Sequence, residues 1–166
     1  MELHWHVIHV SSRTEKKVAE RLEKKGFLVY LPIQKQLRQW SDRKKWVDMI
    51  LVSGYVFVKT NAQQHINVLE TNGVSRFLRH AGKPVIISET EMTNFQNFIS
   101  RAENRPVEFT PEHLPIGSAV TIEYGHFKGL SGEIVQYKGK RKLIVHLTNF
   151  GNCSLELSPA DISPKA

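Results

Sequence analysis

The chain has 166 residues, of which 40% are hydrophobic, and it carries a formal net charge of +7 at pH 7. This length suits one ordinary domain or two small ones, and no apolar run approaches the ~20 residues that a membrane-spanning helix needs. Cys153 is the single cysteine, which excludes an internal disulfide and argues against a thiolate zinc site. Because the N-terminal residues also lack the pattern of a signal peptide, we expect a cytoplasmic protein with no membrane contact.

The excess positive charge lies in the first part of the chain. Residues 1–105 contain 17 Lys and Arg against 10 Asp and Glu, whereas residues 106–166 contain 6 of each kind. A basic balance favours contact with phosphate backbones, but it specifies neither a sequence nor a type of nucleic acid.

Up to about residue 103, strand patterns and helix patterns are mixed along the sequence. The first helix is marked at its start by Ser12 and Glu15, which have the spacing of a capping box, and at its end by Gly26. In chain order the predicted elements are a strand at 3–10, this helix, a strand at 27–31, a hairpin tip at 39–46, a strand at 50–60, a helix at 63–71, short strands at 76–78 and 84–87, and a helix carrying Met92, Phe95, Phe98 and Ile99. The mixture predicts an α+β layer structure.

The strand at 50–60 departs from the alternation that a half-buried strand should show. Val56 and Val58 point to one face, while Tyr55 and Phe57 point to the other, so both faces are apolar. Either the second face is buried under another layer, or it is an aromatic docking surface for a partner.

The pattern changes after residue 103. Residues 104–115 carry three prolines and little apolar periodicity, which is typical of a semi-extended linker. Beyond them, short β-branched runs separated by glycines predict a small five-stranded barrel. The expected organisation is therefore a domain at 1–103, a linker at 104–115 and a barrel at 116–166.

Residues 120–135, VTIEYGHFKGLSGEIV, resemble a KOW motif, with Gly125, Phe127, Gly129 and Gly132 in the family's places. The glycines allow tight reversals between short strands, and Phe127 can fill a small barrel.

The segment SGYVFVKT at residues 53–60 resembles the signature of the NusG family of transcription elongation factors. Further matching features are Trp5 and Val7, RTEKKVAERL at 13–22 and NGVSRFLR at 72–79. The chain is most similar to the specialised RfaH and UpxY-like antiterminators, which often act on polysaccharide operons. The resemblance implies an antiparallel sheet with flanking helices, joined to an SH3-like KOW barrel.

In that family the first domain binds the clamp coiled coil of RNA polymerase, and the resemblance places Tyr55 and Phe57 in the docking patch. A second polymerase contact is implied at Gln64, His65 and Asn67. By bridging the cleft, such a factor disfavours pausing through a population shift rather than through a chemical reaction.

Three basic groups are candidates for nucleic-acid binding, and each has a solvated surface as its alternative. The resemblance relates the first two to contacts with non-template DNA in the transcription bubble, and the third is a hairpin that could reach upstream DNA. They are Lys17, Arg21 and Lys24; Thr71, Asn72, Arg76 and Arg79; and Arg38, Arg43, Lys44 and Lys45 between Trp40 and Trp46.

The barrel is expected to bind a second partner, which by resemblance is a small-subunit ribosomal protein or the termination factor Rho. Phe150 and Gly151 match the family's contact loop, with a strand-connecting turn as the alternative. We expect the barrel to be stable rather than to switch to a helical form, because glycines inside a helix cost ~1 kcal/mol each.

The sequence supports neither an enzyme nor a cofactor. His4 and His6 share a strand face, but no third ligand has suitable spacing, so no metal site is expected. The leading hypothesis is a monomeric transcription elongation or antitermination factor acting on particular operons. The alternative is a ribosome-associated or general RNA-binding protein, against which the neutral charge of residues 106–166 argues.

Overall fold

The computed structural model describes residues 2–111, 117–123, 125–137, 139–158 and 161. The chain divides into two compact units, and each unit is built from two stretches of sequence. Unit 1 comprises residues 1–32 and 52–92, and unit 2 comprises residues 33–51 and 93–166. This division differs from the expected boundary near residue 103, because the hairpin at 33–51 and most of the third helix group with the barrel.

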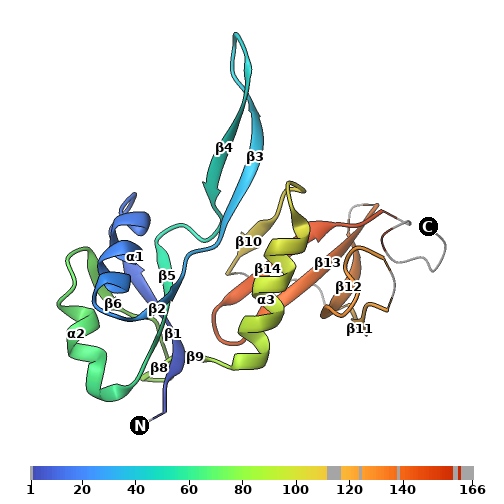
Figure 1. The fold of residues 1–166 in the computed structure, drawn as a ribbon. Helices are drawn as coiled ribbons and strands as arrows, with labels where there is room; N and C mark the ends of the chain where they lie inside the picture. Colours follow the sequence, from blue (N-terminus) through green and yellow to red (C-terminus); the bar gives the residue numbers. More distant parts are fainter. Residues whose placement is uncertain (1, 112–116, 124, 138, 159–160, 162–166) are drawn as a thin grey trace. The chain divides into compact units, whose positions relative to one another are not determined.

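Unit 1 contains an antiparallel sheet whose strands follow the order β2-β5-β1-β6, with β9 also pairing with β1 (Figure 1). Directly opposite residues in β1 and β5 include Ile8 with Val56 and Val7 with Phe57. A separate ribbon pairs β7 with β8. The strands are β1 (His4–Val10), β2 (Leu28–Tyr30), β5 (Tyr55–Thr60), β6 (Val74–Phe77), β7 (Arg79–His80), β8 (Lys83–Pro84) and β9 (Ile86–Ile87).

The helix α1 (Glu15–Lys24) packs on one face of this sheet through a narrow apolar stripe. Its Val18 and Leu22 are fully buried in a cluster with Ile8, Val56 and Val58. Each such side chain contributes roughly 1.5–3 kcal/mol by its removal from water. A short 3₁₀ turn, η1 (Ala62–Gln64), precedes the helix α2 (His65–Leu69), whose Val68 joins the same cluster.

The start of α1 differs from the capping box expected from Ser12 and Glu15. Thr14 is the N-cap residue, and its side chain makes no cap hydrogen bond. The Glu15 carboxylate is buried and instead accepts a hydrogen bond from the Gly54 N–H at 2.9 Å. The acidic residue therefore joins the helix start to the turn before β5.

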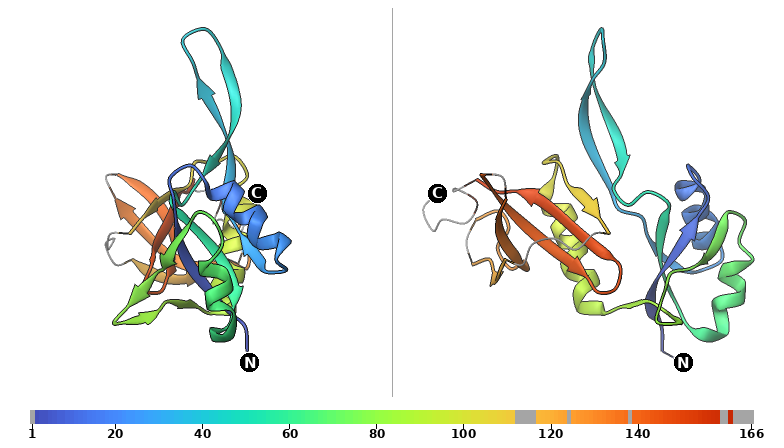
Figure 2. Two further views of the ribbon diagram at one scale, coloured as in Figure 1. Left: turned by 90° about the vertical axis from the view of Figure 1, so that its left-hand side faces the viewer. Right: turned by 180° about the vertical axis from the view of Figure 1, so that it is seen from behind.

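Unit 2 begins with a long two-stranded hairpin formed by β3 (Ile33–Gln39) and β4 (Lys44–Ile50) (Figure 2). Its turn lies within the predicted hairpin tip, which confirms that prediction. Opposite pairs in the register include Leu37 with Trp46 and Arg38 with Lys45.

The remainder of unit 2 combines the helix α3 (Glu89–Ala102, in unit 2 from Thr93) with a five-stranded antiparallel sheet. The strands follow the order β10-β14-β13-β12-β11. They are β10 (Glu108–Thr110), β11 (Ser118–Thr121), β12 (Ser131–Tyr137), β13 (Lys140–Leu147) and β14 (Gly151–Glu156).

The segment expected to be a linker is partly structured. Its residues 108–110 form β10 and pair with β14, with Phe109 opposite Cys153. Val107 is buried just before this strand, so the segment carries apolar anchors that its prolines obscure in the sequence. Residues 112–115 of the expected linker lie outside the described residues.

The core of the all-β part contains Phe127, which is fully buried, together with Leu143, Ile144 and Leu155. Gly132 marks a close approach of strands, since a Cβ there would lie 2.5 Å from the Ile144 carbonyl oxygen. The α+β part followed by a five-stranded all-β part confirms the predicted fold class. Within the described part of the chain, no helix is long and apolar enough to span a membrane.

Candidate functional site

The second apolar face of β5 is largely covered in the structure. Phe57 is fully buried, and its ring centroid lies 6.2 Å from that of Tyr30. Tyr55 is only partly buried, and its ring meets His9 edge to face at 5.1 Å. Leu28, opposite Lys59 in the sheet, is exposed on the same face. Leu28 is thus the exposed apolar side chain of this face, Tyr55 and Tyr30 are partly buried, and Phe57 lies in the interior.

The structure brings together two of the basic groups predicted to bind nucleic acid. The guanidinium of Arg21 on α1 donates a hydrogen bond to the Asn72 carbonyl at 2.8 Å. Lys17 and Lys24 remain exposed on the same helix, and the Asn72 side chain is exposed beside it. The helix and the loop after α2 therefore form one surface, which we call the α1 surface.

Lys25, at the end of α1, joins the helix to α2 and to the loop after it through two hydrogen bonds. Nothing in the sequence identified this residue. Its ammonium donates to the Asn67 carbonyl at 3.0 Å and to the Thr71 hydroxyl at 2.9 Å. Thr71 is buried, so it supports the loop rather than offering a free hydroxyl. Gly73 allows the loop to approach α1, since a Cβ there would lie 2.6 Å from Val18 Cγ2.

Arg76 and Arg79 extend the basic character along β6 and β7. Both are exposed. Arg76 lies opposite His9 in the β1–β6 pairing, and the Arg79 guanidinium donates to the Gly82 carbonyl at 3.0 Å.

The three residues of the predicted second polymerase contact, Gln64, His65 and Asn67, differ in how far they are buried. Gln64 is exposed, whereas His65 packs on Phe77 with ring centroids 4.3 Å apart and on His6 at 4.9 Å. His65 Nε2 is buried and has no hydrogen-bond partner among the described residues. Asn67 is half-buried, and its carbonyl accepts from Lys25. Of these three residues only Gln64 has an exposed side chain, and its Oε1 accepts a hydrogen bond from the Asn67 amide at 3.4 Å.

His6 and His65 form a neutral pair at neutral pH. Burial, reinforced by the nearby His65, lowers the pKa of His6 to about 4. Burial, with the Arg79 charge, also lowers the pKa of His65. His6 Nδ1 lies 3.1 Å from the Val85 carbonyl, which accepts, so this nitrogen carries the proton.

The hairpin presents a distinct cationic surface. Arg38 and Lys45 lie directly opposite each other, and like charges in such a pair destabilise a hairpin. Trp40 and Trp46 are each 50% exposed near the same end. A hairpin tip that is merely solvated explains why these charges are exposed. It does not explain why Arg38 and Lys45 lie directly opposite each other in the register.

Phe150 and Gly151 lie where β14 begins. The Phe150 ring is half-buried and lies 5.1 Å from Phe109 of β10, so it packs on the barrel. Gly151 is also half-buried, opposite Leu147. Of the KOW-like residues, Phe127 fills the core, and Gly125 and Gly129 are exposed in the loop that carries it.

No group of three or more His, Cys, Asp or Glu side chains among the described residues is arranged to hold a metal ion. Cys153 is buried, and burial raises the pKa of its thiol to about 12. Such a thiol is inert rather than nucleophilic.

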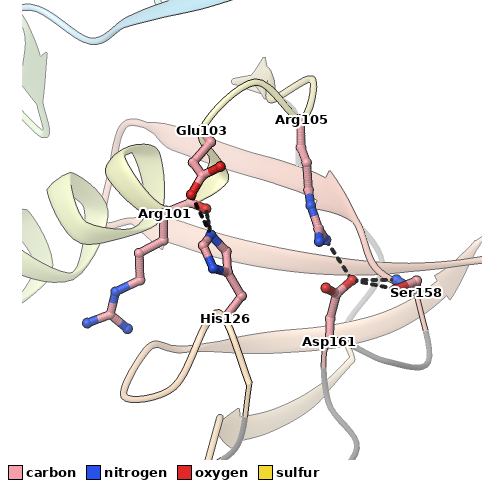
Figure 3. Close-up of polar contacts among 6 residues, drawn as sticks. All are labelled: Arg101, Glu103, Arg105, His126, Ser158 and Asp161. Atoms are coloured by element: carbon pink, nitrogen blue, oxygen red, sulfur yellow. Dashed lines mark hydrogen bonds and ion pairs between the residues drawn. The ribbon is translucent and has the colours of Figure 1, made fainter. Parts of the chain in front are cut away.

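Sequence reasoning missed a polar network that holds the barrel to α3 and to the chain that follows it (Figure 3). Arg105 donates to Asp161 at 2.6 Å, and its guanidinium lies 5.1 Å from the Phe127 ring centroid. His126 Nε2 donates to the Arg101 carbonyl at 2.6 Å and lies 3.3 Å from Glu103 Oε1. The only sequence signal was the density of charged residues at 101–105, which has no periodicity to identify partners.

Comparisons with known proteins agree with this architecture. The family model described as "Transcription termination factor nusG" matches residues 3–96. The "Transcription termination/antitermination protein NusG" of Halalkalibacterium halodurans is 30% identical over 167 residues, covering 91% of this chain and 92% of that protein. A solved structure titled "Domain interaction in Thermotoga maritima NusG" matches with a TM-score of 0.58 and 23% identity, covering 100% of this chain and 99% of that one. The chain therefore belongs to the NusG family, a family of transcription factors rather than enzymes.

Proposed function

We propose that this protein binds RNA polymerase during transcription elongation and suppresses pausing or termination. The proposal rests on the match of residues 3–96 to the NusG family model. The α1 surface lies within these residues. The relative from Halalkalibacterium halodurans is named as a termination and antitermination protein, which fits the same activity.

Polymerase docking is assigned to the sheet face that carries Tyr55 and Phe57. Tyr55 is a partly exposed aromatic on this face, which also carries the exposed Leu28, and aromatic anchors commonly dominate protein interfaces. Phe57 is buried, so its side chain stabilises β5 by packing in the interior. The clamp coiled coil of the polymerase is the proposed partner.

Non-template DNA is the proposed ligand of the α1 surface. Lys17 and Lys24 are exposed, Arg21 is fixed by its bond to Asn72, and Arg76 and Arg79 add charge on β6 and β7. Cations placed this way bind phosphates and release counterions. The hairpin tip, where Arg38 faces Lys45, is a second DNA-binding candidate directed to upstream DNA.

A second polymerase contact through Gln64, with His65 and Asn67 behind it, would bridge the cleft and stabilise the closed clamp. Action on particular operons, such as polysaccharide operons in the manner of RfaH and UpxY-like factors, is the finer part of the proposal. Through Phe150 and Gly151 the barrel would contact a small-subunit ribosomal protein or Rho. The protein would work as a monomer in the cytoplasm.

General RNA binding through the barrel is the alternative function. The charge distribution disfavours it, because residues 106–166 contain 6 basic and 6 acidic side chains. The basic side chains of the α1 surface lie in unit 1 and not in the barrel.

Single-round transcription on a template with a defined pause site tests the proposal. Added protein should shorten the lifetime of the paused complex, and a Tyr55→Ala variant should need a higher concentration for the same effect. An unchanged pause lifetime at saturating protein on all templates would contradict it.

A further inference from the structure

A buried side-chain amide at the base of the β3–β4 hairpin reaches a segment 69 to 73 residues further along the chain. Gln34 is 3% exposed. Its Nε2 donates to the Glu103 carbonyl at 3.1 Å and to the Arg105 carbonyl. Its Oε1 accepts from the Val107 N–H at 3.1 Å and from the Gln36 amide at 2.8 Å.

These four bonds use the full capacity of the group. A primary amide has two N–H donors and one oxygen with two lone pairs, and each of them is engaged. The partners also fix its orientation, because two carbonyls require the nitrogen and a backbone N–H requires the oxygen. Such a group cannot be replaced by an apolar side chain without leaving buried backbone groups unpaired.

The segment bound by Gln34 contains a residue in an unfavourable backbone conformation. Glu103 follows the last residue of α3 and has a positive φ of 53°. A non-glycine residue in this region costs roughly 1–2 kcal/mol and persists where its surroundings hold it. Val107 is 5% exposed, so its N–H has no access to water once the bond to Gln34 is lost.

This segment leads directly into β10, the short edge strand that pairs with β14. Arg105, within the segment, is anchored independently by Asp161. The bonds to Gln34 therefore control the stretch between Arg105 and β10 rather than the attachment of the whole barrel.

We propose that Gln34 is a latch that couples the β3–β4 hairpin to the edge of the barrel. While the latch is closed, the stretch between Arg105 and β10 keeps the conformation that delivers β10 to β14. When the latch opens, Val107 loses its bond to Gln34 and β10 separates from β14, so the base of the hairpin and the barrel edge change conformation together.

Amide hydrogen exchange followed by NMR on the full chain tests the latch. Gln34→Met keeps the side-chain length but removes all four bonds. It should speed exchange of the Val107 amide and the β10 amides about tenfold or more, as expected for an unpaired buried group. The core amides of Leu143, Ile144 and Val145 should keep their wild-type rates.

Gln36→Met is the matched control. Gln36 is half-buried on the same hairpin face and donates to Gln34, but none of its hydrogen bonds within the described part of the chain reaches residues 103–107. Its variant should leave Val107 protected. If Gln34→Met does not fold, Gln34→Asn provides the same test, because its amide is one methylene too short to span the gap.

The proposal is overturned if Val107 exchanges at the wild-type rate in a folded Gln34 variant. It is equally overturned if Val107 and the core amides accelerate by the same factor, since the effect is then global unfolding. Loss of Val107 protection in the Gln36 control would also contradict a latch centred on Gln34.

Discussion

Arg105 and Asp161 form a short ion pair in which the carboxylate is buried and the guanidinium lies over Phe127. The Arg105 hydrogen bond holds the pKa of Asp161 at about 2, although burial opposes this. Ser158 contributes two further hydrogen bonds, from its N–H at 2.7 Å and its hydroxyl at 2.9 Å. Asp161 thus fastens the chain after β14 to the segment that precedes β10.

Asp161→Asn should destabilise unit 2 by about 1 kcal/mol, toward the low end for a charged hydrogen bond because Arg105 is partly exposed. Since the pKa of Asp161 in the folded protein lies below its ordinary value of 3.8, the stabilising contribution of this carboxylate is present above pH 4 and is lost as the pH falls toward 2. In thermal unfolding curves, the stability of the variant should therefore fall less than that of the wild type as the pH drops from 4 to 2.

Glu156→Gln is the control for this prediction, because its pair with Lys140 at 3.6 Å is exposed on both sides. It should unfold as the wild type does. Equal destabilisation by the two substitutions would show that the Arg105–Asp161 pair has no special role.

The His6–His65 pair predicts that unit 1 loses stability in mild acid. His6 has a pKa of about 4 in the folded protein, against an ordinary value of 6.5, so between these pH values only the unfolded chain binds a proton at this residue. Stability should fall as the pH drops from 6.5 to 4, by about 3 kcal/mol from His6. Denaturant unfolding at several pH values measures this.

His6→Phe should flatten this dependence, leaving the smaller part due to His65, because phenylalanine fits the aromatic surroundings but does not titrate. His80→Gln, at an exposed position of β7, should leave the slope intact. A wild-type slope in His6→Phe would refute the assignment.

The α1 surface predicts a specific change in salt dependence. Replacing Lys17 and Lys24 by alanine should weaken binding to a single-stranded non-template oligonucleotide and lower the magnitude of the slope of log K against log salt by about 1.4, because each of the two phosphate contacts releases ~0.7 counterions. Replacing the exposed barrel residues Lys128 and Lys140 removes the same charge and should leave the slope unchanged. Equal slopes for the two double variants would mean that charge, rather than position, governs binding.

Substitutions at Tyr55 and Phe57 should affect different properties, namely polymerase binding at Tyr55 and stability at Phe57. Phe57→Ala should cost roughly 3–5 kcal/mol of stability, as expected for a fully buried phenylalanine. Tyr55→Ala should cost less and should instead weaken polymerase binding. Unfolding curves and binding isotherms on both variants check this, and a stable Phe57→Ala protein with lost binding would reverse the assignment.

Periodicity predicted the elements well because it records which face of an element is apolar. The α1 stripe of Val18 and Leu22 and the Val56 face of β5 were both readable in this way. Periodicity cannot record what covers a second apolar face, so it left the burial of Phe57 open. The turn signals likewise located the hairpin but not the register that sets Arg38 against Lys45.

The polar contacts were beyond sequence reasoning for a different reason. Gln34 meets Val107 across 73 positions, and a single glutamine in a strand gives no sign of its partner. The prolines at 104–115 predicted a linker, whereas Val107 and Phe109 supply the contacts that order part of it. Long-range hydrogen bonds depend on the fold as a whole, and local propensity does not encode them.

Binding to RNA polymerase can be measured with the purified protein and assembled RNA polymerase elongation complexes, with ribosomes as the competing target. We expect stable co-migration with the elongation complex, weakened by Tyr55→Ala, and no greater enrichment on ribosomes than on polymerase. Recovery of the folded protein with ribosomes but not with polymerase would refute polymerase binding and favour the RNA-binding alternative.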